Sequence, residues 1–302
     1  MKDGDARDKR GHDAENTAII GGMKKPAANQ KTLGKFSGHL VLLGAGNMGA
    51  AMLDGWLARG LSPKKLVVID PQPGKPVKAL TRRGLKLNPK RKPVEAAAIV
   101  IAVKPQTAPA AVPPLGVHVG KSTLVLSIMA GRTLAFLENA LPSGTAIVRA
   151  MPNTPASIGR GISVAVANAQ VSTRQRKLAS DLLAAIGTVE WVGDEALIDA
   201  VTALSGSGPA YVFLLAEAMT KAGIAAGLPA ELAGRLARET VAGSGELLHR
   251  SDLDAATLRQ NVTSPGGTTA AALTVLMGPG GFDELLSEAI AAATERSREL
   301  AG

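Results

Sequence analysis

The sequence contains no cysteine and very few aromatic residues. The absence of cysteine from all 302 residues excludes disulfides, thiolate nucleophiles and cysteine-ligated metals, and it fits a reducing compartment. Aromatic residues make up 2% of the chain, so no stacking platform for nucleic-acid bases is visible. The net charge of +9 is scattered along the chain. We therefore expect the charge to favour an anionic cofactor or substrate, and we expect no nucleic-acid partner.

Long apolar runs are also missing. No stretch reaches the roughly 18–20 apolar residues that span a bilayer, and the N-terminal residues mix both charge signs, unlike a signal peptide. These features predict a cytoplasmic protein without a membrane partner. No metal site is expected, because none of the histidines has a second histidine or a carboxylate at metal-ligand spacing. The histidines are His12, His39, His118 and His249.

The pattern of apolar residues divides the chain into three regions. Residues 1–37 are polar and read as a disordered tail. Residues 38–194 alternate short apolar strands with helices, which predicts a dinucleotide-binding domain. Residues 195–302 carry helical signals only, which predicts a helical domain; its roles in substrate binding and dimerisation are implied by the family resemblance described below. The expected fold class is therefore α/β, with an N-terminal Rossmann-like, doubly wound, mostly parallel sheet followed by an all-helical C-terminal domain.

Individual elements are expected at the following positions. Strands are predicted at 39–43, 65–70, 85–87, 97–105, 122–131, 145–153, 161–168 and 188–193. Helices are predicted at 47–60, 76–84, 173–187, 195–228, 229–248 and 283–301.

The first candidate site is a glycine-rich turn between a strand and a helix. Gly44, Gly46 and Gly49 form the pattern G-x-G-x-x-G, and Asp70 ends the second strand. Glycines here permit a tight turn, close approach to a pyrophosphate and close packing of helix on strand. The N-terminus of the helix then presents unpaired N–H groups to the phosphates. This context predicts a dinucleotide site.

The identity of the cofactor is left open by the residues around Asp70. A carboxylate at this position accepts hydrogen bonds from the ribose and repels a 2′-phosphate, which favours NADH over NADPH. Lys75, Lys78, Arg82 and Arg83 follow shortly afterwards and can offset that repulsion.

Two further strands end in segments that are expected to line the nicotinamide pocket. These segments are "AVKPQ" at 102–106 and "SIMAG" at 127–131, and ligands of such sheets bind at the carboxyl ends of the strands. Lys104 is either a catalytic lysine or a structural, phosphate-facing one. We favour the second interpretation.

A second candidate site lies near the C-terminus, in "TSPGGTTAAAL" at 263–273. Two glycines and two threonines precede an Ala/Leu run that reads as a helix. Bare backbone and hydroxyl groups at the N-terminus of a helix are suited to holding a small polar ligand. The alternative is that the Ser-Pro turn only caps the helix.

Six motifs together resemble the pyrroline-5-carboxylate reductase family. They are "GAGNMG" at 44–49, "AVKPQ" at 102–106, "SIMAG" at 127–131, "RAMPNTPA" at 149–156, "DAVTALSGSGPAYVF" at 199–213 and "NVTSPGGTT" at 261–269. The resemblance covers residues 38–300. It implies reduction of 1-pyrroline-5-carboxylate to L-proline, the last step of proline biosynthesis, by NADPH or NADH. It also implies a homodimer, sometimes assembled into a larger ring such as a decamer, with the active site between one subunit's cofactor and the partner's helical domain.

The resemblance also assigns roles to individual residues. It implies that Ser264, Gly266, Gly267, Thr268 and Thr269 bind the substrate carboxylate and ring, and that Thr269 positions the ring nitrogen as the catalytic residue. Glu195 matches a carboxylate near the substrate. The residues expected to bind the cofactor are Gly44, Ala45, Gly46, Asn47, Met48, Gly49, Asp70, Pro71, Ala102, Val103, Lys104, Pro105, Met129, Ala130 and Asn261. Arg91 replaces an asparagine that often touches the adenosine side of the cofactor. This departure can bring a positive charge towards a 2′-phosphate, which works against the preference for NADH suggested by Asp70.

Two other functions fit the sequence less well. A hydroxyacid dehydrogenase of similar architecture relies on a helical lysine followed by an asparagine one turn later, but Lys221 is followed by Ala225 at that distance. A non-enzymatic NAD sensor would keep the glycine pattern but would not need "SPGGTT".

Overall fold

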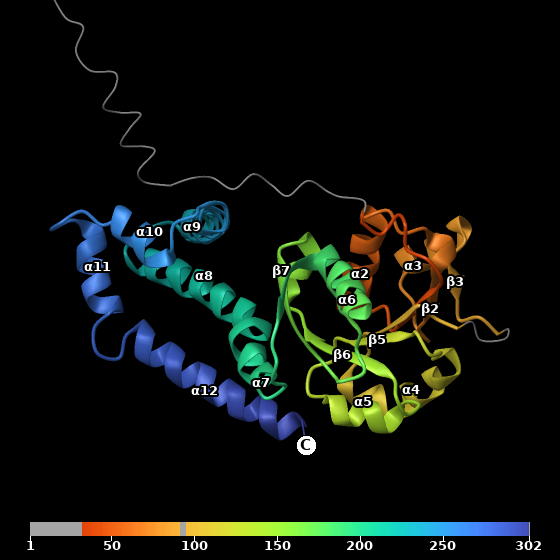
Figure 1. Ribbon diagram of the computed structural model, residues 1–302. Coiled ribbons are helices and arrows are strands. Elements are labelled where there is room, and N and C mark those ends of the chain that lie inside the picture. Colours follow the sequence, from red (N-terminus) through yellow and green to blue (C-terminus); the bar gives the residue numbers. More distant parts are fainter. Residues whose placement is uncertain (1–31, 91–94, 302) are drawn as a thin grey trace, which may run out of the picture. The chain divides into compact units, whose positions relative to one another are not determined.

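The computed structural model describes residues 32–90 and 95–301 (Figure 1). The described residues form two compact units, one running up to Pro209 and including Ala289 onward, and the other comprising Ala210–Glu288. The first compact unit therefore extends to Pro209, beyond residue 195, where the sequence predicted the second domain to begin. Most of the predicted tail lies outside the described residues. Its last part differs from the prediction, because Leu33 and Phe36 are 3% and 8% exposed and pack into the core.

The first unit contains an eight-stranded sheet in the order β3-β2-β1-β4-β5-β6-β7-β8. All neighbouring strands are parallel except β6 and β7. This arrangement confirms the predicted doubly wound, mostly parallel sheet. The strands are β1 (Leu40–Leu43), β2 (Leu66–Ile69), β3 (Lys86–Leu87), β4 (Ala98–Ile101), β5 (Leu124–Ser127), β6 (Ala146–Met151), β7 (Gly161–Ala167) and β8 (Gly187–Trp191).

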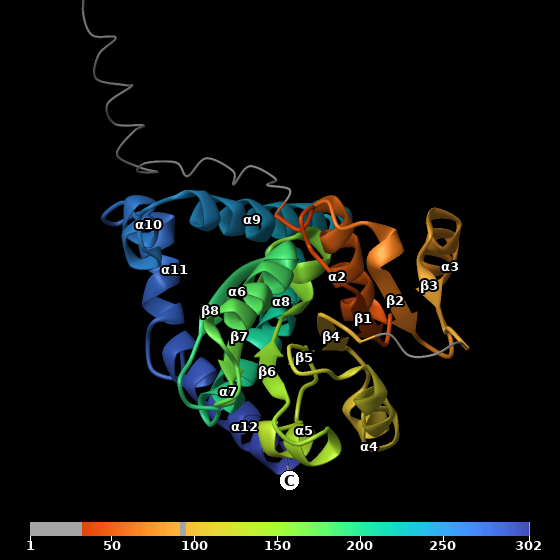
Figure 2. The same cartoon turned by 45° about the vertical axis from the view of Figure 1, so that its right-hand side comes forward.

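Helices cover both faces of this sheet (Figures 1 and 2). Because side chains alternate along a strand, Leu40 and Leu42 belong to the apolar layer shared with α2 (Asn47–Ala58) and α6 (Thr173–Leu183). Val41 and Leu43 belong to the opposite layer, with α4 (Ala108–Ala111) and α5 (Leu134–Ala140). Burial on both faces explains why the central strands are continuously apolar.

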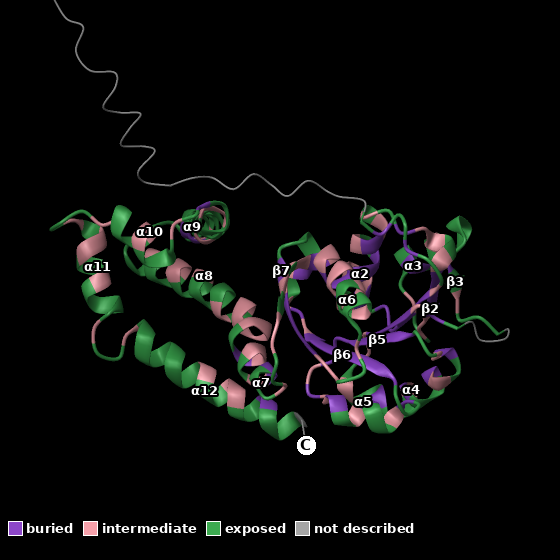
Figure 3. Cartoon of the chain, in the orientation of Figure 1, coloured by how far each residue is buried: buried purple, intermediate pink, exposed green. Residues whose placement is uncertain are grey.

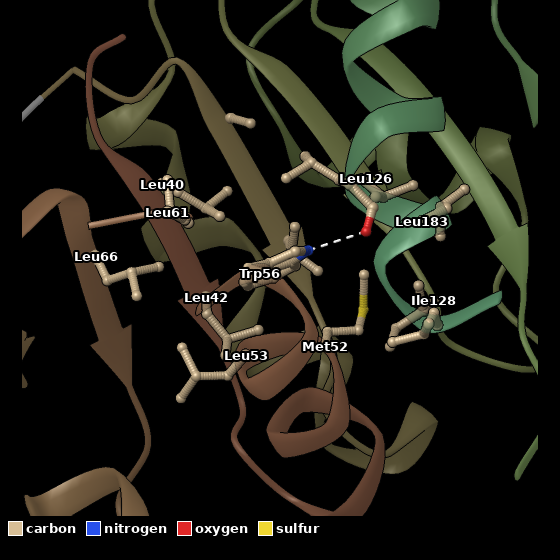
Figure 4. Packing of buried hydrophobic residues seen from close by; sticks show 14 of the residues in the cluster. Leu40, Leu42, Met52, Leu53, Trp56, Leu61, Leu66, Leu126, Ile128 and Leu183 are labelled. Atoms are coloured by element: carbon tan, nitrogen blue, oxygen red, sulfur yellow. Dashed lines mark hydrogen bonds between the residues drawn. The ribbon is translucent and has the colours of Figure 1, made fainter. Parts of the chain in front are cut away.

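Trp56 anchors α2 in its layer (Figure 4). Its side chain is fully buried among Leu40, Leu42, Met52 and Leu183. Its indole Nε1 donates a hydrogen bond to the carbonyl of Leu182, 2.9 Å away. This bond satisfies the polar group that burial would otherwise leave unpaired. Helix α2, whose N-terminus begins the candidate nucleotide site, is therefore anchored against the sheet at its C-terminal end.

The predicted helix at 195–228 is interrupted. It consists of α7 (Leu197–Val201), a π-helical turn (Thr202–Gly206) and α8 (Gly208–Ala225). A side chain at Gly206 would place its Cβ 2.6 Å from Cε of Met151, so the π turn lies close to the end of β6. Extra turns of this kind are frequent at functional sites.

The remaining helices agree with the predicted pattern only in part. Those that match predicted segments are α3 (Lys75–Leu80), α9 (Ala230–Arg250) and α12 (Phe282–Ala301). Helix α11 (Thr268–Leu276) begins inside the second candidate site, as its sequence suggests. Short helices α4, α5 and α10 (Ala255–Asn261) were not predicted. They contain 4, 7 and 7 residues, too few for a periodic pattern to stand out.

The second unit has few buried side chains (Figure 3). No residue of α8 or α11 is buried, and Phe213 of α8 is 69% exposed. The described residues include one helical run, Leu197–Ala225, that is long and apolar enough to suit a membrane span, and 11% of its most apolar window is buried. Exposed apolar surface of this extent marks an interaction surface.

Candidate functional site

The first site lies along the carboxyl edge of the sheet. Strands β1, β2, β4, β5 and β6 run parallel, so the loops that follow them meet at one edge. The strand order reverses at β1 and β4, where the crevice of such sheets binds nucleotides. The hydrogen-bond ladder extends one residue beyond the strands, since Gly44 N–H donates to Ile69 O at 2.8 Å and Ala102 N–H donates to Leu43 O at 2.8 Å.

The three glycines of the fingerprint occupy different environments. Gly44 adopts φ +87°, and a Cβ there would lie 2.7 Å from the carbonyl oxygen of Ala102. A Cβ on Gly49 would lie 2.3 Å from the carbonyl oxygen of Gly44. Gly46, the N-cap of α2, would meet nothing within 4 Å. Gly44 and Gly49 therefore allow close packing, whereas Gly46 leaves open space in front of the helix N-terminus, as a bound pyrophosphate requires.

Asp70 is bound directly to this loop. Its Oδ2 accepts a hydrogen bond from the N–H of Ala45 at 2.6 Å, and its Oδ1 accepts one from Gln72 at 2.7 Å. The prediction that Asp70 belongs to the nucleotide site is consistent with this geometry. The carboxylate also has a structural role that the sequence did not suggest, because it holds the glycine-rich turn in place through the Ala45 amide.

The other predicted cofactor residues lie in the loops of the same edge. Met129 is 2% exposed and its N–H donates to Oγ of Ser127 at 3.3 Å. Lys104 is exposed and is the N-cap of a short 3-10 turn, and Nε of Arg132 donates to the carbonyl of Pro105 at 3.0 Å. Asn47 and Pro71 are exposed, whereas Met48, Ala102, Val103 and Ala130 are half-buried.

The second site, around Ser264, belongs to the helical unit. Gly266 has φ +70°, and Gly267 is the N-cap of α11. The N–H of Gly267 donates to the carbonyl of Ser264 at 3.0 Å, so this amide closes the turn and is not available to a ligand. No side chain caps α11, so the cap-only interpretation of Ser264 is wrong. Within the part of the chain that the structure describes, the first amides of the helix, those of Thr268 and Thr269, donate to no backbone carbonyl.

Asn261 is exposed at the end of α10, one turn before this segment. It is separated from the glycine fingerprint in the sequence and lies in the other compact unit. Its predicted contact with the cofactor stays a prediction.

Glu195, predicted to lie near the substrate, has structural contacts within the first unit. Its Oε1 accepts hydrogen bonds from Nη1 of Arg149 at 2.7 Å and from the N–H of Leu134 at 2.8 Å. Arg149 is 3% exposed, and Leu134 begins α5. The carboxylate thus neutralises a buried guanidinium and satisfies an amide at a helix N-terminus.

Removing the Glu195 carboxylate should therefore destabilise the fold. We expect Glu195→Ala to lower the free energy of unfolding by about 2–4 kcal/mol, because Arg149 would be left buried and unpaired. Urea denaturation measures the change, and Glu190→Ala, on an exposed position of β8, is the control. Unchanged stability combined with lost activity would instead favour a role at the substrate.

Comparisons with known proteins identify the family. The chain is 42% identical over 267 residues to a pyrroline-5-carboxylate reductase of Pseudomonas aeruginosa, covering 87% of this chain and 97% of the relative. The chain belongs to the pyrroline-5-carboxylate reductase family. A family model described as "Pyrroline-5-carboxylate reductase dimerisation" matches residues 195–300, and one described as "NADP oxidoreductase coenzyme F420-dependent" matches residues 39–131.

Solved structures of this reductase family agree with the fold. A pyrroline-5-carboxylate reductase from Coxiella burnetii has a TM-score of 0.80 at 35% identity, covering 88% of this chain and 99% of that one. A pyrroline carboxylate reductase from Plasmodium falciparum, solved with NADP bound, has a TM-score of 0.73 at 30% identity, covering 90% of this chain and 100% of that one. The resemblance predicted from the motifs is confirmed, and the chain is an oxidoreductase of this family.

Two polar residues of this reductase have structural roles that their local sequence does not indicate. Arg149 lies within an apolar strand, so nothing local marked it as the partner of Glu195. Asn88 hydrogen-bonds the backbone of Asp70, and its one sequence signal was the Asn-Pro pair that often marks a turn. Arg91, predicted to affect the adenosine side, lies outside the described residues.

Proposed function

We propose that this protein reduces 1-pyrroline-5-carboxylate to L-proline with NADH or NADPH, the last step of proline biosynthesis. The observation that carries the proposal is the identity of 42% to a curated pyrroline-5-carboxylate reductase over almost its whole length. The NADP bound in the Plasmodium falciparum relative and the open space at Gly46 support a nicotinamide dinucleotide as the cofactor.

The residues of the first site would hold this cofactor by its phosphates and ribose. The N-terminus of α2 and the amides around Gly46 offer hydrogen-bond donors and a partial positive charge to the pyrophosphate. Asp70 would accept hydrogen bonds from the ribose. The loops at Ala102–Pro105 and Met129–Ala130 would enclose the nicotinamide, which supplies a hydride when bound.

The residues of the second site would hold the substrate. The amides of Thr268 and Thr269 at the N-terminus of α11 suit a carboxylate, a contact that contributes about 0.3–2 kcal/mol. Ser264 adds a hydroxyl, while Gly266 and Gly267 keep the approach to the backbone clear. The Thr269 hydroxyl would hydrogen-bond the ring nitrogen. Because a threonine hydroxyl is a weak acid, its contribution is orientation of the imine for hydride transfer.

We further propose a cytoplasmic homodimer that assembles into a larger ring, such as a decamer formed by five dimers. The dimerisation model that matches residues 195–300 supports an oligomer, and the exposed apolar side chains of α8 are explained by a partner helix. A partner helix would also account for the exposed apolar run Leu197–Ala225 without a membrane. Size-exclusion chromatography with light scattering tests the proposal, and a monomer at micromolar concentration would refute it.

A steady-state assay tests the reaction itself. The purified chain should oxidise NADH or NADPH when 1-pyrroline-5-carboxylate is added, and proline should appear in equal amount. The reduced coenzyme should stay unoxidised with buffer alone, and NAD+ should not be reduced when a hydroxyacid is added. Nucleotide binding without turnover of the imine would favour the sensor function instead.

A further inference from the structure

We propose that Asn88 is a positioning residue that aims Asp70 at the cofactor ribose, and that the two residues together make NADH the preferred cofactor of this chain. The preference concerns the nucleotide site and rests on the proposed function only in requiring that a nicotinamide dinucleotide binds there. Asn88 does not need to touch the cofactor, because it acts through Asp70.

The side chain of Asn88 forms hydrogen bonds with both the N–H and the carbonyl of Asp70. The N–H of Asp70 donates to Oδ1 of Asn88 at 2.9 Å, and Nδ2 of Asn88 donates to the carbonyl of Asp70 at 2.7 Å. The N–H of Asn88 donates in turn to Val68 O at 2.9 Å. These three bonds join the end of β3 to the end of β2, and they fix the direction in which the Asp70 side chain leaves the backbone.

The backbone at Asn88 adopts a conformation that suits this task. Its φ is +43°, the one positive φ at a non-glycine position among the residues that the structure describes. Left-handed backbone is costly for most side chains, but asparagine tolerates it. Such conformations persist where the surrounding contacts require them, and they gather at functional sites. Here the conformation lets the Asn88 amide reach back to Asp70.

The carboxylate of Asp70 is held and still has acceptor capacity. An ionised carboxylate offers about four lone-pair positions, and the amides of Ala45 and Gln72 occupy two of them. Two positions remain for the paired hydroxyls of a ribose, and Asp70 is only half-buried. A ribose that carries a 2′-phosphate would offer no hydroxyl there and would bring negative charge to the carboxylate.

The downstream cations do not neutralise this carboxylate. Lys75, Lys78, Arg82 and Arg83 are exposed, and none of these four residues forms an ion pair with Asp70. Each carries a long side chain with free rotamers, so placing its charge beside a 2′-phosphate costs conformational entropy. Compared with these four cations, the fixed carboxylate therefore has the larger influence on the choice between the two nucleotides.

Calorimetric titration with NADH and with NADPH, in the absence of imine, tests the proposal. The parent protein should bind NADH at least about tenfold more tightly than NADPH. Asp70→Ser should reduce that ratio by about tenfold or more. Asn88→Gly removes the amide yet tolerates φ +43°, and it should reduce the ratio by about threefold to tenfold. The double variant should match Asp70→Ser, since Asn88 acts through Asp70. Lys86→Ala, on the exposed side of β3, should behave like the parent.

The same ratio measured as kcat/KM for the two nucleotides gives an independent readout, and thermal melting shows whether each variant is folded. An Asn88→Gly protein that is folded and keeps the parental ratio, or loses both nucleotides equally, would overturn the role of Asn88. A parent that prefers NADPH would overturn the whole proposal. Retained nucleotide preference without imine reduction would instead refute the proposed reaction and leave this inference standing.

Discussion

Gly49→Ala is expected to weaken nucleotide binding by about 100-fold or more. The new Cβ would lie 2.3 Å from the carbonyl oxygen of Gly44 and 3.3 Å from Cβ of Ala102. Neither atom belongs to a flexible side chain, so either α2 or the turn before it must move. Displacing binding groups by about 1 Å can cost about 100-fold, and overpacking should also lower stability by about 1–3 kcal/mol.

Gly46→Ala is the matched control for this effect. A Cβ at Gly46 meets no atom within 4 Å, so the melting temperature should stay at the parental value. Affinity for NADH should still fall, because the methyl group would enter the space assigned to the pyrophosphate. Thermal melting and calorimetric titration of both variants separate weaker binding caused by displaced backbone from weaker binding caused by direct obstruction of the pyrophosphate. Parental affinity in Gly46→Ala would remove that position from the phosphate site.

The second large effect is expected at Thr269. Thr269→Ala should lower kcat/KM for 1-pyrroline-5-carboxylate by about 10- to 1,000-fold, the range for losing a group that positions a substrate or assists proton transfer. The hydroxyl is assigned to the ring nitrogen, and an imine that is not oriented accepts a hydride slowly. Steady-state kinetics at saturating NADH measure the change.

Two variants on α11 sharpen this test. Thr269→Ser keeps the hydroxyl and should recover most of the rate. Thr274→Ala removes a hydroxyl whose hydrogen bond is already made to the carbonyl of Ala270 at 3.0 Å, and it should leave the kinetics unchanged. A parental rate in Thr269→Ala would exclude this hydroxyl from the reaction.

The sheet was predictable because its strands are buried on both faces. Runs such as Leu40–Leu43 and Ala98–Ile101 are wholly apolar, and turn residues separate them from the helices. The predicted strands extend too far where apolar residues continue into a loop, as at Ala102 and Val103 after β4. The π turn was not predictable, because it depends on how Gly206 packs near Met151, a residue distant in sequence.

The residues of the nucleotide site were easier to predict from the sequence than the polar side chains that hold other residues in place. The glycines and Asp70 have a fixed spacing that follows from the needs of a phosphate ligand. Asn88 acquires its role only when β3 pairs with β2, and Arg149 only when Glu195 folds back over β6. Such contacts join segments whose separation in sequence carries no regular pattern.

The bond between Asp70 and the amide of Ala45 has a consequence for redesigning the coenzyme requirement. Under the proposed assignment, one carboxylate would both discriminate at the ribose and support the turn that receives the pyrophosphate. A substitution that only removes the charge would reduce the preference between NADH and NADPH. It would also lower the affinity for both coenzymes. A substitution that changes the preference to NADPH, the coenzyme with the 2′-phosphate, must therefore supply a neutral acceptor for the Ala45 amide. Serine or asparagine at position 70 can do so.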